Sequence, residues 1–165
     1  MSEKANTLQV YESYYSDFSG PIGGDERFRW VIKNFFSESA SPAHELLEVG
    51  CGEGSLLKLL RDKGYVVRGV DASETGVSKA RAQKLDCVVS DSSKDKYPFA
   101  PGFFDTILCL ETLEHLENPY HCMMEIKRVL KLGGRFMLSI PNPIIDHPFC
   151  YPGLFDYASF RLFLE

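Results

Sequence analysis

No part of this 165-residue sequence contains the run of about 20 apolar residues that a membrane-spanning helix requires. The first 18 residues also lack the apolar centre of a secretory signal, so we expect a cytoplasmic protein with no membrane partner. Basic residues are in deficit, because 18 Lys and Arg stand against 23 Asp and Glu, which gives a net charge of −5. This balance argues against a nucleic-acid partner held through its phosphates.

Paired cysteine motifs are also absent. The five cysteines are odd in number and form no CxxC or CxxH pair, and Cys87 and Cys109 lie in apolar runs typical of buried strands. We interpret the cysteines as reduced thiols that act as small hydrophobic residues. Repeats and low-complexity tracts are missing too. A content of 44% hydrophobic and 25% charged residues is typical of one soluble globular domain.

The sequence does contain an alternation of short apolar runs and amphipathic segments. Strands are expected at 46–49, 66–70, 87–89, 104–110 and 136–140. A helix from Asp25 is predicted to bury Phe28, Val31, Ile32, Phe35 and Phe36, and a second helix over 56–60 ends before Gly64. A third is capped by Ser73 and runs to about Lys84; a fourth follows Asn118-Pro119, buries Met123, Ile126 and Leu130, and ends at Gly133-Gly134.

This alternation predicts an α/β, Rossmann-like, doubly wound parallel sheet with helices on both faces. In such a sheet the ligand lies beyond the carboxyl ends of the strands, at the point where the strand order reverses. We therefore expect the functional residues in the segments that directly follow the strands.

A glycine-rich turn, Glu48-Val49-Gly50-Cys51-Gly52-Glu53-Gly54, follows the first strand, and Asp71 ends the second. Glycines permit positive φ angles and a close approach of ligand to backbone, and a carboxylate at Asp71 suits the two hydroxyls of a ribose. Sites for NAD and FAD use GxGxxG and bind a pyrophosphate, but here the third glycine comes one residue early. Glu48 would repel a pyrophosphate, so the loop favours a ribose-bearing ligand with a positive end, such as S-adenosylmethionine (SAM).

The chain resembles the class I (Rossmann-like) SAM-dependent methyltransferases in four ordered blocks, LLEVGCGEG, GVDAS, FDTILCLETLEHL and RVLKLGGRFMLSIPNP, which cover about residues 44–143. Within that family it is similar to the small-molecule, ubiquinone-pathway type. The resemblance implies SAM as cofactor and S-adenosylhomocysteine as product. It also implies direct displacement of the methyl group to an O, N or C atom of a small-molecule acceptor. One departure is Leu132, where relatives often have proline.

The resemblance also implies the cofactor-binding residues. Glu48, Gly50, Cys51 and Gly52 would lie under the methionine half, Asp71 would bind the ribose, Ala72 would line the adenine, Asp91 would accept the adenine amino group beside Ser92, and the backbone carbonyl of Leu110 would face the cofactor amino group.

His115 is the candidate catalytic residue, because it follows the fourth strand and would take a proton from a substrate hydroxyl. Helix capping or packing is the alternative role. Glu111, Glu114 and His115 also form an ExxEH cluster that suits a divalent cation and resembles one in ubiquinone-pathway O-methyltransferases and small-RNA 3′-end methyltransferases. We leave these alternatives open and predict no residue as a metal ligand.

We expect one domain over 1–165, with an N-terminal lid and first helix at 1–40, a SAM-binding core at 44–143 and an aromatic, substrate-side segment at 144–165. In the lid, Tyr14 or Tyr15 is a candidate to face the cofactor sulfonium. The family sheet has seven strands, whereas the sequence predicts five, so we expect a truncated fold that lacks the last two.

Such a truncated sheet would leave its fifth strand as an exposed edge, which a partner chain or a dimer would cover. The alternative function is therefore a SAM-binding but catalytically weak partner or regulatory subunit, or a short isoform. A protein or RNA methyltransferase is a further alternative.

Overall fold

The computed structural model describes residues 12, 24–36, 41 and 43–140. Five strands of this part form one parallel sheet: β1 (Glu45–Val49), β2 (Val66–Asp71), β3 (Asp86–Val89), β4 (Phe104–Leu110) and β5 (Leu130–Ser139). The helices are α2 (Gly24–Phe35), α3 (Ser55–Arg61), α4 (Glu74–Ala82) and α5 (Pro119–Val129), with a short 3-10 helix, η1 (Leu113–His115). The strand order is β3-β2-β1-β4-β5, and every pair is parallel. The predicted α/β doubly wound sheet is confirmed, and its order reverses between β1 and β4.

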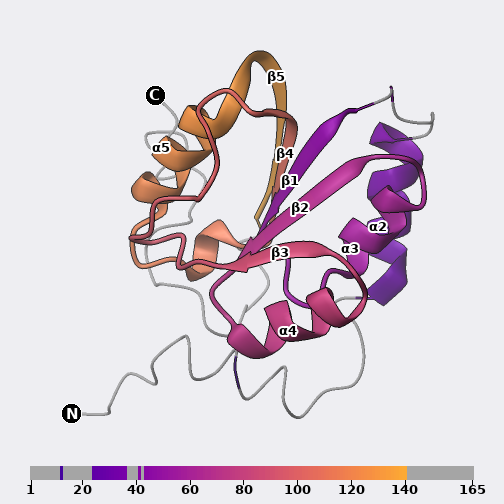
Figure 1. Ribbon diagram of the computed structural model, residues 1–165, viewed down its shortest axis with the longest axis horizontal. Coiled ribbons are helices and arrows are strands. Elements are labelled where there is room, and N and C mark those ends of the chain that lie inside the picture. Colours follow the sequence, from indigo (N-terminus) through magenta and orange to yellow (C-terminus); the bar gives the residue numbers. More distant parts are fainter. Residues whose placement is uncertain (1–11, 13–23, 37–40, 42, 141–165) are drawn as a thin grey trace.

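Helices cover both faces of the sheet (Figure 1). One core joins α2, α3 and α4 to the sheet, and the other joins α5 to the opposite face. Neighbouring residues of β1 serve the two layers, since Leu46 belongs to the first core and Leu47 to the second. Both are fully buried, which explains why the strands are continuous apolar runs rather than alternating ones.

Local capping signals determine where several helices begin and end. The hydroxyl of Ser73 accepts the N–H of Gly76 at 2.9 Å at the start of α4. The side chain of Asn118 accepts the N–H of His121 at 3.1 Å at the start of α5. Gly64 has a φ of 93° just after α3, as a C-terminal glycine requires. These three predictions are confirmed.

The prediction that Phe35 belongs to the buried face of α2 is wrong. Phe36 is buried and packs edge-on against Tyr65, with ring centroids 5.4 Å apart. Phe35 is 45% exposed and packs edge-on against Trp30. The reason is that α2 ends at Phe35, so the chain leaves the helical period there and Phe36 takes the place in the core.

The predicted boundary between the last helix and the fifth strand is also wrong. The helix ends at Val129, and the strand begins at Leu130 instead of after Gly133-Gly134. The glycine pair lies inside β5 at an irregularity, where Phe104 pairs with Leu130 but Thr106 pairs with Arg135. The buried residues of α5 are Pro119, Cys122, Glu125, Ile126 and Val129. Of the predicted stripe, Ile126 is therefore buried as expected, whereas Met123 and Leu130 are half-buried.

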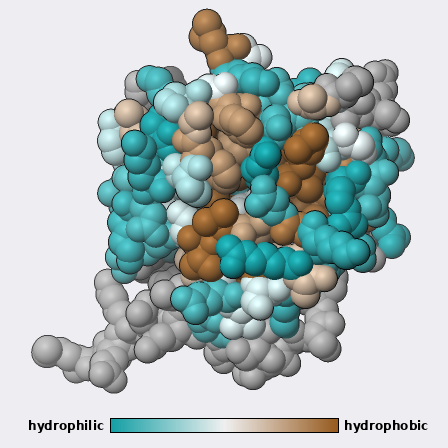
Figure 2. Space-filling view, in the orientation of Figure 1, coloured by the Kyte–Doolittle hydropathy of each residue, from teal (hydrophilic) through white to brown (hydrophobic). Residues whose placement is uncertain are grey.

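No helix among the described residues combines the length and the apolar character needed to cross a bilayer. The face drawn in Figure 2 is largely hydrophilic, with separate hydrophobic patches. The exposed large apolar side chains are Trp30, Phe35, Val66, Val89, Tyr120, Met124 and Leu132. Four cysteines, Cys51, Cys87, Cys109 and Cys122, are buried free thiols, in agreement with the sequence interpretation, and Cys150 lies outside the described residues.

Candidate functional site

The glycine-rich turn lies between β1 and α3. Gly50, Gly52 and Gly54 all have positive φ angles, of 76°, 51° and 81°, as the sequence predicts. The backbone N–H groups of Gly50 and Cys51 both donate to the carbonyl of Val70 on β2, at 2.9 and 3.2 Å. The turn is therefore held against the neighbouring strand, and its glycines leave room for other side chains, because a Cβ atom at Gly54 would lie 2.3 Å from Cδ1 of Leu85.

Asp71 ends β2 beside this turn. Its Oδ2 accepts the N–H of Gly52 and its Oδ1 accepts the N–H of Ser73, both at 2.8 Å. Burial raises the pKa of the Asp71 carboxyl, the two N–H bonds act against that rise, and the charge of Glu12 adds to it. Each oxygen keeps a lone pair, so the carboxylate can still accept two hydroxyl donors from a ligand.

The predicted cofactor residues follow the strand order along one edge of the sheet. Asp91 comes after β3, Asp71 ends β2, the glycine turn follows β1, and Leu110 ends β4. Three interstrand spacings separate β3 from β4, or roughly 14 Å. Glu48 is buried on β1, next to Gly69 of β2 and Leu108 of β4. The edge is thus lined by acceptors and suits an elongated ligand with hydroxyl and cationic donors.

The side chains of Asp91 and Ser92 have different hydrogen-bond partners. Asp91 accepts the N–H of Ser93 at 2.9 Å and pairs with Lys94 at 2.9 Å. Burial acts to raise the pKa of Asp91, but the bonds from Lys94 and Ser93 outweigh it and lower the pKa. Ser92 is buried, and its hydroxyl accepts the hydroxyl of Tyr97 at 2.9 Å. Its side chain therefore faces the interior, whereas Asp91 keeps a charged carboxylate.

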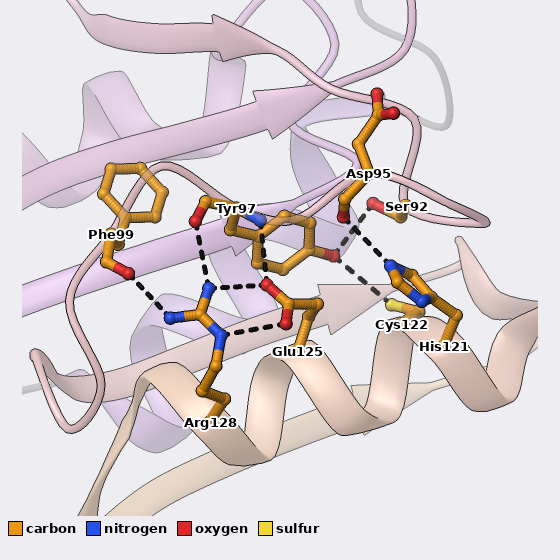
Figure 3. Close-up of polar contacts among 8 residues, drawn as sticks. All are labelled: Ser92, Asp95, Tyr97, Phe99, His121, Cys122, Glu125 and Arg128. Carbon is orange, nitrogen blue, oxygen red and sulfur yellow. Dashed lines mark hydrogen bonds and ion pairs between the residues drawn. The ribbon is translucent and has the colours of Figure 1, made fainter.

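The segment that carries Asp91 is fastened to α5 by a buried polar cluster (Figure 3). Glu125 accepts the N–H of Tyr97 at 2.8 Å, and Arg128 binds Glu125 through two nitrogens at 2.8 and 2.5 Å. Arg128 also donates to the carbonyls of Phe99 and Tyr97 at 2.7 and 2.9 Å. Burial raises the pKa of the Tyr97 hydroxyl far above its usual range, so this group stays protonated. The cluster was missed by the sequence analysis, because nothing local signals a contact between residues about 30 positions apart.

The ExxEH residues lie just past β4. Glu114 is fully buried, and His115 keeps 12% of its side chain exposed with Nε2 3.6 Å from Oε1 of Glu114. Glu111 has a φ of 50° and accepts the hydroxyl of Ser139 at 2.7 Å. In the part of the chain that the structure describes, no three His, Cys, Asp or Glu side chains are grouped to hold a metal ion.

Glu12 is another residue that the sequence analysis did not single out. It accepts the N–H groups of Glu74 and Thr75 at 2.6 and 3.3 Å, at the first turn of α4. Burial acts to raise the pKa of Glu12, but hydrogen bonds from Thr75 and Ser73 and from the backbone lower it overall. A residue about 60 positions away in the chain thus contacts the start of the helix that follows Asp71.

Other histidines have structural partners. Nε2 of His44 lies 3.0 Å from the hydroxyl oxygen of Thr106, and Nε2 of His121 lies 3.0 Å from the carbonyl oxygen of Asp95.

Some predicted residues lie outside the described part of the chain: Tyr14, Tyr15, most of the 1–40 segment and the 144–165 segment. Ala72 is half-buried directly after Asp71, and its contact with an adenine stays a prediction.

Comparisons with known proteins agree with this geometry. A family profile described as "Methyltransferase domain" matches residues 47–138. The chain is 33% identical over 115 residues to a ubiquinone biosynthesis O-methyltransferase of Pseudomonas paraeruginosa, an alignment that covers 66% of this chain and 50% of that relative. The chain spans about half the length of the curated relatives it matches.

Solved structures show the same fold. A protein of Pyrococcus horikoshii superposes with a TM-score of 0.62 and 26% identity, covering 80% of this chain and 63% of that one. A phosphoethanolamine N-methyltransferase of Haemonchus contortus, solved in complex with S-adenosyl-L-methionine, gives a TM-score of 0.62 at 23% identity, with 79% and 32% coverage. At that identity the second likeness is one of fold alone.

Proposed function

Because this chain belongs to the class I, Rossmann-like family of methyltransferase domains, we propose that it binds SAM and transfers its methyl group to a small-molecule acceptor. The observation that carries the proposal is the order of acceptor groups along the sheet edge, Asp91, Asp71, the glycine turn and Leu110. The adenine, ribose and methionine parts of SAM follow one another in the same order. Family membership agrees with the sequence resemblance, and the ligand and the reaction are our inference.

The hydrogen-bond acceptors at this edge fit SAM better than a dinucleotide. Asp71 offers a carboxylate for two ribose hydroxyls, and Asp91 offers one for the adenine amino group. Glu48 is buried behind the turn, where a pyrophosphate would be repelled and a cationic ligand attracted. When bound, SAM supplies a methyl group on a positive sulfur, so its transfer needs alignment and exclusion of water rather than activation of the leaving group.

His115 is our candidate for the proton acceptor when the acceptor is a hydroxyl. It follows β4 on the same edge as the proposed cofactor site, and a fully buried carboxylate, Glu114, lies beside its ring. A neighbouring carboxylate favours the protonated imidazole that forms when a hydroxyl loses its proton. The small exposed fraction of the ring leaves it accessible to a substrate and shielded from bulk water.

We propose an oxygen acceptor on a small aromatic molecule. The P. paraeruginosa relative is named as an O-methyltransferase of ubiquinone biosynthesis, which supports a hydroxyl acceptor. Phenolic hydroxyls arrive protonated near neutral pH, so such an acceptor would need the base that His115 supplies. The aromatic residues of the 144–165 segment suit an apolar pocket for a planar acceptor.

A turnover assay tests this function. The chain is incubated with SAM and a panel of phenols and catechols, and S-adenosylhomocysteine formation is measured. We expect turnover with at least one catechol, a loss of about 100-fold or more in His115→Ala, and unchanged cofactor affinity in that variant. His44→Ala, at the opposite end of the sheet before β1, is the matched control and should keep full activity. Unimpaired transfer by His115→Ala would remove His115 as the base.

One observation favours the second candidate, a SAM-binding subunit with little activity of its own. β5 pairs with β4 on one side, and no described strand pairs with its other side. A partner chain or a second copy that adds a strand there would complete the sheet. Tight binding of S-adenosylhomocysteine without turnover of any acceptor would support this candidate over the first.

A further inference from the structure

Thr112 packs directly on the glycine turn. A Cβ atom built on Gly50 would lie 2.3 Å from Oγ1 of Thr112 and 2.7 Å from its Cγ2. Both distances are far shorter than real contacts, so the absence of a side chain at position 50 makes room for this threonine. The ExxEH segment and the glycine turn are thus in contact through one residue.

The hydroxyl of Thr112 lies between the ends of two neighbouring strands. Its Oγ1 is 3.3 Å from the carbonyl oxygen of Val49, at the end of β1, and 3.1 Å from that of Leu110, at the end of β4. These are the two strands at which the sheet order reverses. A hydroxyl has a single proton, so Thr112 can donate to only one of the two carbonyls at a time.

The residue before Thr112 has an unusual backbone conformation. Glu111 has a φ of 50°, which a residue other than glycine rarely adopts. Ser139 of β5 secures it twice: its carbonyl accepts the N–H of Glu111 at 3.0 Å, and its hydroxyl donates to the Glu111 carboxylate at 2.7 Å. Backbone strain of this kind persists only where surrounding contacts enforce it.

We propose that Thr112 is a positioning residue for the amino end of the cofactor. Its hydroxyl proton holds the Leu110 carbonyl in place and transfers its hydrogen bond to Val49 when the ammonium group of the ligand donates to Leu110. This inference rests on the proposed binding of SAM. It differs from a purely packing role, which would depend on the methyl group of Thr112, so that Thr112→Ser and not Thr112→Val would lose affinity.

Two ligands separate these roles in calorimetric titrations of the full chain. S-Adenosylhomocysteine carries the amino-acid end, whereas 5′-methylthioadenosine has the same adenosine and sulfur without it. We expect Thr112→Val, which keeps the shape and removes the hydroxyl, to bind S-adenosylhomocysteine about three- to tenfold more weakly. Its affinity for 5′-methylthioadenosine should stay within about twofold, and Thr112→Ser should bind both ligands like the wild type.

Equal affinities of Thr112→Val and wild type for S-adenosylhomocysteine, or an equal loss for both ligands, would overturn the inference. If Thr112→Val does not fold, Thr112→Ala against Thr112→Ser makes the same comparison, since these two differ only in the hydroxyl. Failure of the wild type to bind either ligand would instead refute the proposed cofactor site.

Discussion

At the residue scale, the proposed site depends most on Asp71. Its two oxygens are already oriented by the N–H groups of Gly52 and Ser73, so the carboxylate is in place before a ligand arrives. Preorganised acceptors bind hydroxyl donors without further loss of side-chain freedom. Burial raises the pKa of the Asp71 carboxyl, and the two N–H bonds act against that rise.

This shift makes the affinity for S-adenosylhomocysteine depend on pH. Acidification protonates Asp71 and removes an acceptor, and because the pKa is raised, affinity should begin to fall at a higher pH than for an ordinary carboxyl. Titrations from about pH 8 to about pH 4 measure the effect. In Asp71→Asn this acid-dependent loss should disappear. An identical pH profile in that variant would assign the titration to another group.

Glu12 provides a second check at the residue scale. Its negative charge contributes to the raised pKa of Asp71, after burial as the larger cause. Glu12→Gln should therefore lower the pKa of Asp71 and move the acid-dependent loss of affinity to lower pH. No displacement of the profile would show that Glu12 does not act electrostatically on the ribose site.

Sequence reasoning reached the residues of the site that lie within motifs and missed those that act through distant contacts. Glu48, Asp71 and the glycines follow from strand ends and turn chemistry, which are local signals. Thr112 and Glu12 have roles that depend on partners about 60 positions away. Such partners are brought near only by the tertiary fold, so no local pattern announces them.

At the scale of elements, the Tyr97, Glu125 and Arg128 cluster joins α5 to the segment that carries Asp91. A lysine ammonium cannot make the several directed bonds of the planar Arg128 guanidinium. Arg128→Lys would therefore leave Glu125 and two backbone carbonyls without some of their hydrogen bonds. We expect a decrease of about 2 kcal/mol in the free energy of unfolding, measured by urea denaturation.

The matched control for that prediction is Arg135→Lys. Arg135 is exposed and makes one 3.5 Å contact with the carbonyl of Phe35, so its replacement should change stability by less than about 0.5 kcal/mol. Similar losses in both variants would mean that the cluster adds nothing beyond a surface charge.

Element boundaries were predictable where a cap defines them and not elsewhere. Ser73 and Asn118-Pro119 begin α4 and α5 as predicted, because their side chains and ring act on the adjacent turn. The start of β5 was misplaced, since glycines at 133–134 normally end a helix, whereas here the pairing of Leu130 with Phe104 ends it earlier. Tertiary pairing overrode the local signal.

At the scale of the whole molecule, β2, β1 and β4 each have a neighbouring strand on both sides, and β1 and β4 are the most completely buried of the three. Native-state hydrogen exchange should therefore find the slowest amides in the middle of β1 and β4, with β3 and β5 exchanging faster. Slower exchange in β5 than in β1 would indicate that another strand covers the outer edge of β5.

The central claim is that the carboxyl edge of β3, β2, β1 and β4 binds SAM, and a calorimetric titration with S-adenosylhomocysteine tests it most directly. The account predicts one-to-one binding by the wild type and at least about tenfold weaker binding by Asp71→Ala, because a charge-assisted bond is lost. Asp86→Ala, at the opposite end of the sheet, should bind normally. A folded wild type that does not bind, or an Asp71→Ala variant that binds as tightly as the wild type, would contradict the claim.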